Sequence, residues 1–343
     1  MKNLPLAMQS EINCYFFYAS PYSILCAYPE YRDYLAECYM QCYGYVVDNL
    51  SHMTFAYADG IGYNDVTYCT GPLDIAYLPY NAGIQIEIKK YVTDAIDNDT
   101  YVNIFTDEYY IEGRSACQKQ HRLHDILIFG HDGDRFHYLT FDRRAYTSSF
   151  PRDTIDEAYK SGHSMDKHTE PDQKTEWLGE RSIVLMKPKK IQKPYIFSPV
   201  RFAENLKLYS RGQFESSYDS FVIPREKCHA GVYNTDIIKY CLNSHEKKIY
   251  ILYPAIHAWY ESKRNLLGKI KYCYEKLGAA ESRLLDEYES KVKKQADKVR
   301  LSFIRLDRSG NLNIEATNAL LTGIADSEAE IIGGICGELA ELV

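Results

Sequence analysis

The feature that most constrains the fold is a predicted β-hairpin over residues 124–142. Two short apolar segments, Ile126–Phe129 and Phe136–Phe141, flank the dipeptide Asp132-Gly133, the strongest short-range signal for a hairpin turn. The loop could contain three residues, with Gly133 or Asp134 in the left-handed conformation. Two residues would then pair across the hairpin when their residue numbers add up to 266. A two-residue loop would instead place the two ends of the hairpin on opposite faces of the sheet.

The ends of this hairpin carry a histidine and an aspartate. In the first register His124 lies opposite Asp142, which allows a hydrogen bond between the imidazole and the carboxylate. Three other histidines lie nearby: His121 precedes the first strand, His131 lies at the turn, and His137 points from the opposite face. We expect these three to be solvent-facing or structural.

A second candidate for chemistry lies near the N-terminus. Residues Asn13–Leu25 begin polar and continue as an apolar, helical segment, in which Pro21 suits the first turn better than the interior. Cys14 is therefore expected just before or within the first turn of a buried helix, where unpaired N–H groups and the helix dipole stabilise a thiolate. The alternative is that Cys14 is a small buried hydrophobic residue, the commonest role of a free cysteine.

The segments between these two candidates predict a mixture of helices and strands. Apolar residues follow a helical spacing from Tyr31 to Leu50, and Tyr101–Phe105 alternates as a strand does. We expect the segment that follows to be a loop or strand end facing the hairpin. It would bring Tyr109, Tyr110 and Arg114 into the candidate cleft as substrate-binding residues.

Polar sequence separates the two halves of the chain. Pro151–Glu180 shows no core pattern, which favours a flap over the cleft, and Arg181–Met186 predicts a last short strand. Lys187–Pro194 contains four lysines and is typical of a linker. We therefore expect one domain over residues 1–190 and a second over residues 195–343.

Helical periodicity dominates the second half. One apolar stripe runs from Trp259 to Tyr274 and stops at Gly278, and another runs from Leu284 to Leu306. Ser327 and Glu330 have the spacing of a capping box ahead of a final helix. The expected fold class is α+β, with a mainly helical C-terminal domain.

Composition argues against several classes of function. The net charge of −7 disfavours nucleic acid as the main partner. The ten cysteines are scattered through 343 residues and lack the spacing of a complete zinc site, so we expect free thiols and no metal. The sequence contains neither the apolar core of a signal peptide nor an apolar run long enough for a membrane span, which predicts a cytoplasmic protein without a membrane partner.

The order of these parts resembles the papain-like superfamily, in particular its C39-peptidase-like branch. In that branch a cysteine heads an N-terminal helix, a central strand follows, and a histidine opens a hairpin that ends in an aspartate. The resemblance implies Cys14 as nucleophile, His124 as base and Asp142 as the residue that orients the imidazole. Gln9 is similar to the branch's oxyanion glutamine, although it lies one residue closer to the cysteine, and Tyr15 replaces the glycine that usually follows the nucleophile.

The second half, where Pro254–Leu267 precedes a long antiparallel helix, resembles the butirosin-H-like proteins of bacterial natural-product clusters. This resemblance implies an acyltransferase that takes an acyl chain from a carrier protein and passes it to a small amine or diamine, as amide synthases of the closthioamide kind do. The backbone N–H of Cys14, with Gln9 or Asn13, would meet the oxyanion. No cofactor is implied, because the phosphopantetheine arm enters with the carrier protein.

Two other functions remain open at the level of sequence. One is a peptidase that cleaves a leader peptide after a double-glycine motif. The other is a binding module that keeps the fold and has lost the chemistry. The presence of a cysteine, a histidine and an aspartate at the expected positions favours an enzyme.

Overall fold

The computed structural model describes most of the chain. The ranges described are 1–8, 11–47, 52–57, 71–141, 145–166, 182–190, 193–213, 228–244, 253–309 and 312–343. Contacts between residues divide the chain into two compact units. The first contains Met1–Arg32 and Ile61–Pro194, and the second contains Asp33–Gly60 and Tyr195–Val343. Residues 33–60, which the sequence placed in the domain 1–190, therefore belong to the second unit.

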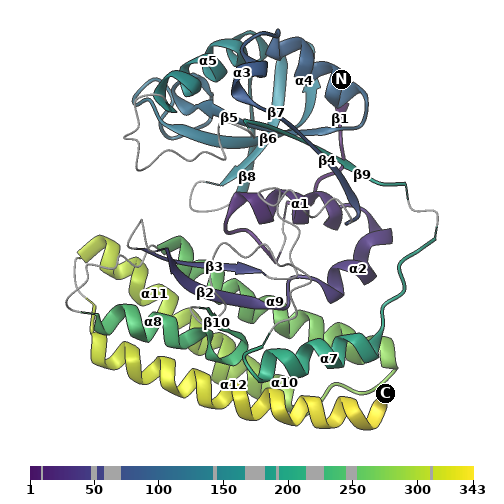
Figure 1. The fold of residues 1–343 in the computed structure, drawn as a ribbon, viewed down its shortest axis with the longest axis vertical. Helices are drawn as coiled ribbons and strands as arrows, with labels where there is room; N and C mark the ends of the chain where they lie inside the picture. The colour runs from purple at the N-terminus through teal and green to yellow at the C-terminus, as the bar shows by residue number, and fades with distance from the viewer. Residues whose placement is uncertain are drawn as a thin grey trace. The chain divides into compact units, whose positions relative to one another are not determined.

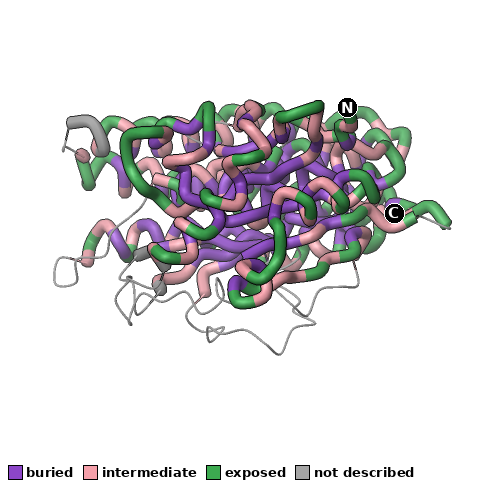
Figure 2. Tube along the Cα trace, turned by 90° about the horizontal axis from the view of Figure 1, so that it is seen from above, coloured by how far each residue is buried: buried purple, intermediate pink, exposed green. Residues whose placement is uncertain are grey.

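A seven-stranded antiparallel sheet forms the centre of the first unit, and its main path runs β4-β9-β5-β6-β7-β8. The middle strand β5 is buried at every position, because the sheet is covered on both faces. The core consists of such strands and the inward faces of the helices, the purple parts of the trace in Figure 2. The strands are β1 (Lys2–Asn3, paired with β6), β4 (Leu73–Leu78), β5 (Tyr101–Asp107), β6 (Leu123–Asp132), β7 (Arg135–Phe141), β8 (Ala145–Pro151) and β9 (Ile183–Pro188).

Helices cover both sides of this sheet. In Figure 1, α1 lies on one side and α3, α4 and α5 lie on the other. Helix α4 shows why its sequence forms a helix here, since Ile88, Val92 and Ile96 recur at four-residue spacing and are all fully buried. The bounds are α1 (Phe16–Cys26), α3 (Tyr80–Gly83), α4 (Ile88–Asp97) and α5 (Ile155–Asp166), with 3-10 turns η1 (Pro29–Tyr31), η3 (Glu108–Tyr110) and η4 (Arg152–Thr154).

Two expectations about helices in this unit were wrong. The segment expected to be a flap contains α5, whose Ile155, Ala158 and Tyr159 are fully buried; its residues 167–180 lie outside the described ranges. Pro21 lies inside α1 rather than in its first turn. A proline at this position removes one backbone N–H from the helix, and the packing of a buried helix offsets that loss.

Strands β6 and β7 confirm the predicted hairpin, but its turn is shorter than the three-residue loop considered first. Asp132 pairs with Arg135, so the loop contains two residues. A β-bulge between Ile128 and Gly130 then shifts the register by one residue. Beyond the bulge Ile128 pairs with Tyr138, and their residue numbers add up to 266, as expected for the longer loop. The bulge therefore restores the expected register beyond the short turn.

The second unit combines a small sheet with helices. Its antiparallel sheet has the order β10-β2-β3. The helical spacing expected from residue 31 to 50 was wrong, because α2 ends at Glu37 and a strand begins at Cys42. The elements are α2 (Arg32–Glu37), β2 (Cys42–Val47), β3 (His52–Tyr57), α7 (Pro199–Ser210), β10 (His229–Ala230), η7 (Gly231–Tyr233), α8 (Asn234–Asn243), α9 (Tyr253–Leu277), α10 (Arg283–Glu287), the π-helix η8 (Tyr288–Lys293), α11 (Lys294–Ser309) and α12 (Ile314–Leu342).

The predicted helical half is confirmed, with a correction at the last helix. α12 begins at Ile314, where the side chain of Asn313 accepts a hydrogen bond from the N–H of Ala316 at 2.9 Å. Ser327, expected as its cap, lies inside this helix. None of the helices in the described ranges is both long enough and apolar enough to cross a membrane.

A buried polar cluster holds the helices of the second unit together. Lys263 and Glu328 form an ion pair at 2.6 Å, and both side chains are fully buried. The ammonium also donates to the Tyr209 hydroxyl at 2.8 Å and to Asn234 Oδ1 at 2.9 Å. The other oxygen of Glu328 accepts from Tyr209 and Tyr288 at 2.9 and 2.7 Å. Helices α7, α8, α9, η8 and α12 are joined in this way, and the buried charges are compensated.

Candidate functional site

Cys14 lies immediately ahead of α1, as the sequence predicted. The residue is only 8% exposed, and the helix begins at Phe16. The first helical hydrogen bond runs from the N–H of Ala19 to the carbonyl of Tyr15 at 3.0 Å. The positive end of the helix dipole therefore lies beside the thiol, an environment that stabilises a thiolate.

The backbone bends sharply between Cys14 and the helix. Tyr15 has φ 58° and ψ 97°. Residues other than glycine rarely adopt a backbone conformation with positive φ. This is the position where the resemblance to papain-like enzymes leads one to expect glycine. The residue type differs, but the backbone has the conformation that glycine adopts most easily.

A ring contact links the head of α1 to the hairpin. Phe16 packs against Phe141 with ring centroids 5.3 Å apart and an interplanar angle of 70°, a favourable edge-to-face arrangement. Phe141 is the last residue of β7, and β7 pairs with β6, the strand that carries His124. The fold of the first unit thus brings the segment after Cys14 to the end of the hairpin where His124 lies.

His124 lies near the start of β6, opposite Thr106 of β5. Its Nδ1 is 3.0 Å from the backbone carbonyl of Asp125 and 3.1 Å from the carboxylate of the same residue. The imidazole is 36% exposed, whereas the Asp125 side chain is 10% exposed. Asp125 therefore contacts Nδ1 of the His124 ring through both its backbone carbonyl and its carboxylate.

The remaining residues of the expected constellation are described only in part. Asp142, expected to orient His124, and Gln9, expected at the oxyanion, lie outside the described residues. Asn13, the other oxyanion candidate, is half-buried and directly precedes Cys14. Its place in the chain puts it next to the backbone of Cys14.

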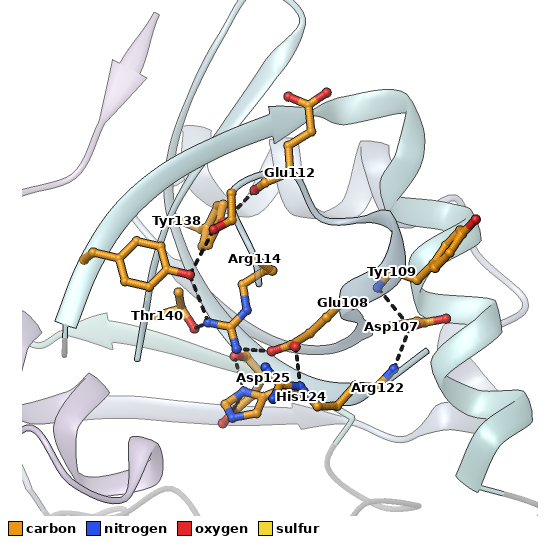
Figure 3. A network of polar contacts seen from close by, with 12 residues as sticks. Asp107, Glu108, Tyr109, Glu112, Arg114, Arg122, His124, Asp125, Tyr138 and Thr140 are labelled. Carbon is orange, nitrogen blue, oxygen red and sulfur yellow. Dashed lines mark hydrogen bonds and ion pairs between the residues drawn. The ribbon is translucent and has the colours of Figure 1, made fainter. Parts of the chain in front are cut away.

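Arg114, expected to bind substrate, is instead fully buried in a polar network (Figure 3). Its guanidinium forms an ion pair with the equally buried Glu108 and donates to Thr140 Oγ1 at 2.5 Å and to the Tyr146 hydroxyl at 3.4 Å. A buried carboxylate requires such a partner, because an unpaired charge in the interior is very costly. Arg114 thus ties the end of β5 to β7 and β8.

Tyr109 and Tyr110 lie on η3, directly after β5, and both are half-buried. Their rings meet edge to face with centroids 5.1 Å apart. The ring of Tyr109 also stacks on the imidazole of His121 at 4.4 Å and 20°. These two tyrosines therefore present aromatic surface next to a histidine other than His124.

The pair formed by His121 and Asp107 was missed from the sequence, where His121 was placed among the solvent-facing or structural histidines. Asp107 Oδ2 lies 2.5 Å from His121 Nδ1 and 2.7 Å from the hydroxyl of Ser161 on α5. A signal did exist. An aspartate ends the apolar strand Tyr101–Asp107, and a histidine precedes the strand that pairs with it, so an antiparallel pairing brings the two together.

Ligation of a metal ion is not supported in the described part of the chain. No group of three or more His, Cys, Asp or Glu side chains in the described ranges is placed to hold a metal ion. None of the cysteines that the structure describes forms a disulfide: Cys14, Cys26, Cys38, Cys42, Cys117, Cys228, Cys241, Cys273 and Cys336.

Comparison with known proteins adds no assignment to this geometry. No protein-family model matches the chain, and no curated protein matches it at a significant level of similarity. The fold and the contacts around Cys14, His124 and Asp107 are therefore the basis for any functional proposal.

Proposed function

We propose that the first unit is a papain-like, C39-peptidase-like thiol acyltransferase, with Cys14 as nucleophile and His124 as base. It would form an amide between the acyl group of a carrier-protein thioester and a small amine. The observation that carries the proposal is the position of Cys14. The thiol precedes a buried helix whose first residue, Phe16, packs on the end of the hairpin that bears His124.

The environment of the thiol suits the first chemical step. The Cys14 thiolate attacks the thioester carbonyl, a tetrahedral oxyanion forms, and the bond to the pantetheine sulfur breaks. His124 gives the departing sulfur the proton that it took from Cys14. The product is an acyl-cysteine together with the free carrier thiol. A thioester gives up its sulfur readily, so this step requires no distortion of the substrate.

The second step reverses these roles. The amine attacks the acyl-cysteine, and His124 accepts the proton that the amine loses as the amide forms. The C–S bond breaks and the Cys14 thiolate returns. The backbone N–H of Cys14 and the side chain of Asn13 or Gln9 would meet the oxyanion in both steps. Asp142 would orient His124 together with Asp125, which lies against Nδ1.

The aromatic residues beside β5 suit the acceptor or the acyl chain. Tyr109 and Tyr110 offer half-exposed rings, which bind apolar groups and, through their π faces, cationic amines. Arg114 is not assigned to substrate, because its guanidinium is fully buried and paired with Glu108. We assign it instead to holding the strand ends in place around the site.

The proposal is tested by intact-protein mass spectrometry after incubation with an acyl carrier protein thioester. The matched control is Cys26→Ala, which removes a thiol from the opposite end of the same helix. There the helix dipole has the opposite sign and disfavours a thiolate. We expect one acyl adduct on the wild type and on Cys26→Ala, none on Cys14→Ala, and faster discharge of the adduct by a diamine than by buffer.

Other outcomes assign other functions. An acyl adduct that persists in Cys14→Ala would place the nucleophile elsewhere. Cleavage of a double-glycine peptide, with no adduct from the thioester, would favour the leader peptidase over the transferase. Absence of both activities would leave the binding module as the better interpretation.

A further inference from the structure

Asp107 is a buried carboxylate with every lone-pair direction in use. Its side chain is 0% exposed, and it ends β5. One oxygen accepts from His121 Nδ1 at 2.5 Å and from the Ser161 hydroxyl at 2.7 Å. The other accepts from the backbone N–H groups of Tyr109 and Arg122 at 3.0 and 3.1 Å. Asp107 is therefore fixed in position by four donors from three segments of the chain.

These donors also keep the carboxylate ionised. Burial acts to raise the pKa of Asp107, but the hydrogen bonds from His121, Ser161 and the two backbone N–H groups outweigh it and hold this pKa below its usual value. An ionised carboxylate only accepts hydrogen bonds. His121 must therefore carry its proton on Nδ1, and its other nitrogen, Nε2, keeps a lone pair when the ring is neutral.

The imidazole of His121 is held firmly but remains accessible. Its side chain is 54% exposed, and the ring stacks on Tyr109 with centroids 4.4 Å apart. Nε2 has no hydrogen-bond partner among the residues that the structure describes. The ring thus has a fixed tautomer and a fixed plane, and it offers a basic nitrogen to solvent.

The other histidine–carboxylate pairs of this sheet differ from this one. In the pair of His131 with Asp97 the imidazole is 12% exposed and the carboxylate 53%, so the burial is reversed. In the pair of His137 with Asp132 the exposed fractions are 24% and 37%. In a third pair, His124 with Asp125, the imidazole is 36% exposed and the carboxylate 10%, and this pair belongs to the proposed thiol site. Of these four pairs in the described residues, His121 with Asp107 has the most exposed imidazole and the only fully buried carboxylate. The arrangement at His121 is the one that general-base catalysis requires.

We propose that His121 and Asp107 form a second proton-transfer site in this unit, separate from Cys14. His121 Nε2 accepts a proton from the O–H or N–H group of a nucleophile, such as water, that attacks a small-molecule substrate, and Asp107 stabilises the imidazolium that forms. The rings of Tyr109 and Tyr110, which we also propose as contacts for the acceptor or acyl chain, lie beside His121 and suit a substrate with a flat, apolar part. Hydrolysis of an aromatic ester is the simplest reaction of this class.

The test uses the full-length Cys14→Ala protein and p-nitrophenyl acetate, so that its outcome is independent of the thiol. A water molecule gives a proton to His121 Nε2 while its oxygen attacks the ester carbonyl. The C–O bond to p-nitrophenolate breaks and acetic acid forms, which ionises to acetate, and the imidazolium releases its proton to solvent. The rate is followed by the absorbance of p-nitrophenolate.

Two variants of the dyad and one control separate catalysis from a structural role. His121→Gln keeps a donor for Asp107 but removes the base. Asp107→Asn keeps an acceptor for the backbone N–H groups, but its amide donates to His121 Nδ1 and forces the proton onto Nε2. We expect the rate to fall at least about tenfold in both variants, and to be unchanged in the control His137→Gln. Nitrogen-15 NMR should show the Nδ1–H tautomer of His121 in the parent and the Nε2–H tautomer in Asp107→Asn.

Several results would overturn the proposal. A rate in His121→Gln equal to that of the parent shows that the imidazole does no chemistry, whatever Asp107→Asn does to the fold. A parent protein whose His121 is protonated on Nε2 contradicts the geometry directly. An equal loss of rate in His137→Gln means that the rate depends on the integrity of the sheet and not on this dyad.

Discussion

Tyr15 has a backbone conformation that is rare for any residue except glycine, and it stands next to the proposed nucleophile. Its φ of 58° imposes strain of roughly 1 kcal/mol or more. Such strain persists when the surrounding structure requires it, here the turn that carries Cys14 into α1. The conformation could not be foreseen from the sequence, because a tyrosine gives no signal for a positive φ.

A comparison of two substitutions tests this backbone strain. Tyr15→Gly and Tyr15→Ala both remove the ring and its stacking on Phe17, so they differ only in backbone freedom. We expect the glycine variant to be more stable than the alanine variant by about 1 kcal/mol in urea unfolding. Glycine is also preferred to alanine at an ordinary helix N-cap, and Tyr15 is the N-cap of α1, so the cap and the positive φ both favour the glycine variant. An alanine variant as stable as the glycine variant would show that Tyr15 is not strained.

Physical reasons decide which residues of the proposed sites the sequence could indicate and which it could not. Cys14 was found because polar residues followed by an apolar helical pattern mark a helix start, and that start is where it lies. Arg114 was taken for a substrate ligand because sequence cannot show that a charged side chain is buried with Glu108. Asp107 was missed because its role depends on donors from β6 and α5, segments distant in the chain.

At the scale of elements, the hairpin shows how far a pattern can predict. The alternation of apolar residues and the Asp-Gly turn predicted both strands, which the structure confirms. The turn holds fewer residues than the loop considered first, yet the register is that of the longer loop, because of the bulge between Ile128 and Gly130. A bulge leaves no trace in a hydrophobic pattern, since it depends on the pairing of two strands.

Helix α5 shows the opposite limit. Its sequence is mostly polar, yet Ile155, Ala158 and Tyr159 are buried. Ala158 and Tyr159 follow Ile155 by three and four positions, the spacing of one helix face. One short stripe in a polar segment was too weak a pattern to identify. The helix matters for the proposed dyad, because Ser161 on α5 donates to Asp107.

The helices of the second unit depend on a buried ion pair, which provides a test at this scale. Lys263→Met leaves the carboxylate of Glu328 buried without its cation. We expect the unfolding free energy to fall by about 3–5 kcal/mol. The matched control is Lys291→Met, which breaks an exposed i,i+4 pair with Glu287 and should change the unfolding free energy far less, because solvent screens an exposed pair. Urea unfolding followed by far-UV circular dichroism measures both, and similar losses in the two variants would contradict the role of the cluster.

At the scale of the whole molecule, the two units are not consecutive pieces of chain. The change from mixed to helical periodicity gave a boundary near residue 190, and Tyr195 does begin the C-terminal part of the second unit. Residues 33–60 join that unit through contacts that sequence does not reveal. Asp33 and Glu37 of this segment accept hydrogen bonds from the backbone N–H groups of Phe197 and Ser198 at 3.1 and 2.6 Å. The α+β class and the helical C-terminal region were predicted correctly. The inclusion of residues 33–60 in the second unit was not predicted.

Cys14 and His124 act as a pair in the proposed mechanism, and the pH dependence of thiol alkylation tests this pairing most directly. Iodoacetamide modifies the thiolate, and peptide mass spectrometry reports the rate at Cys14 alone. An imidazolium near the thiol, together with the helix dipole, should keep Cys14 reactive between about pH 6 and 7, below the usual thiol pKa of about 8.5. His124→Gln should lose this reactivity, and the control His137→Gln should retain it. If Cys14 in all three proteins reacts only as the pH approaches about 8.5, the two residues are not a catalytic pair.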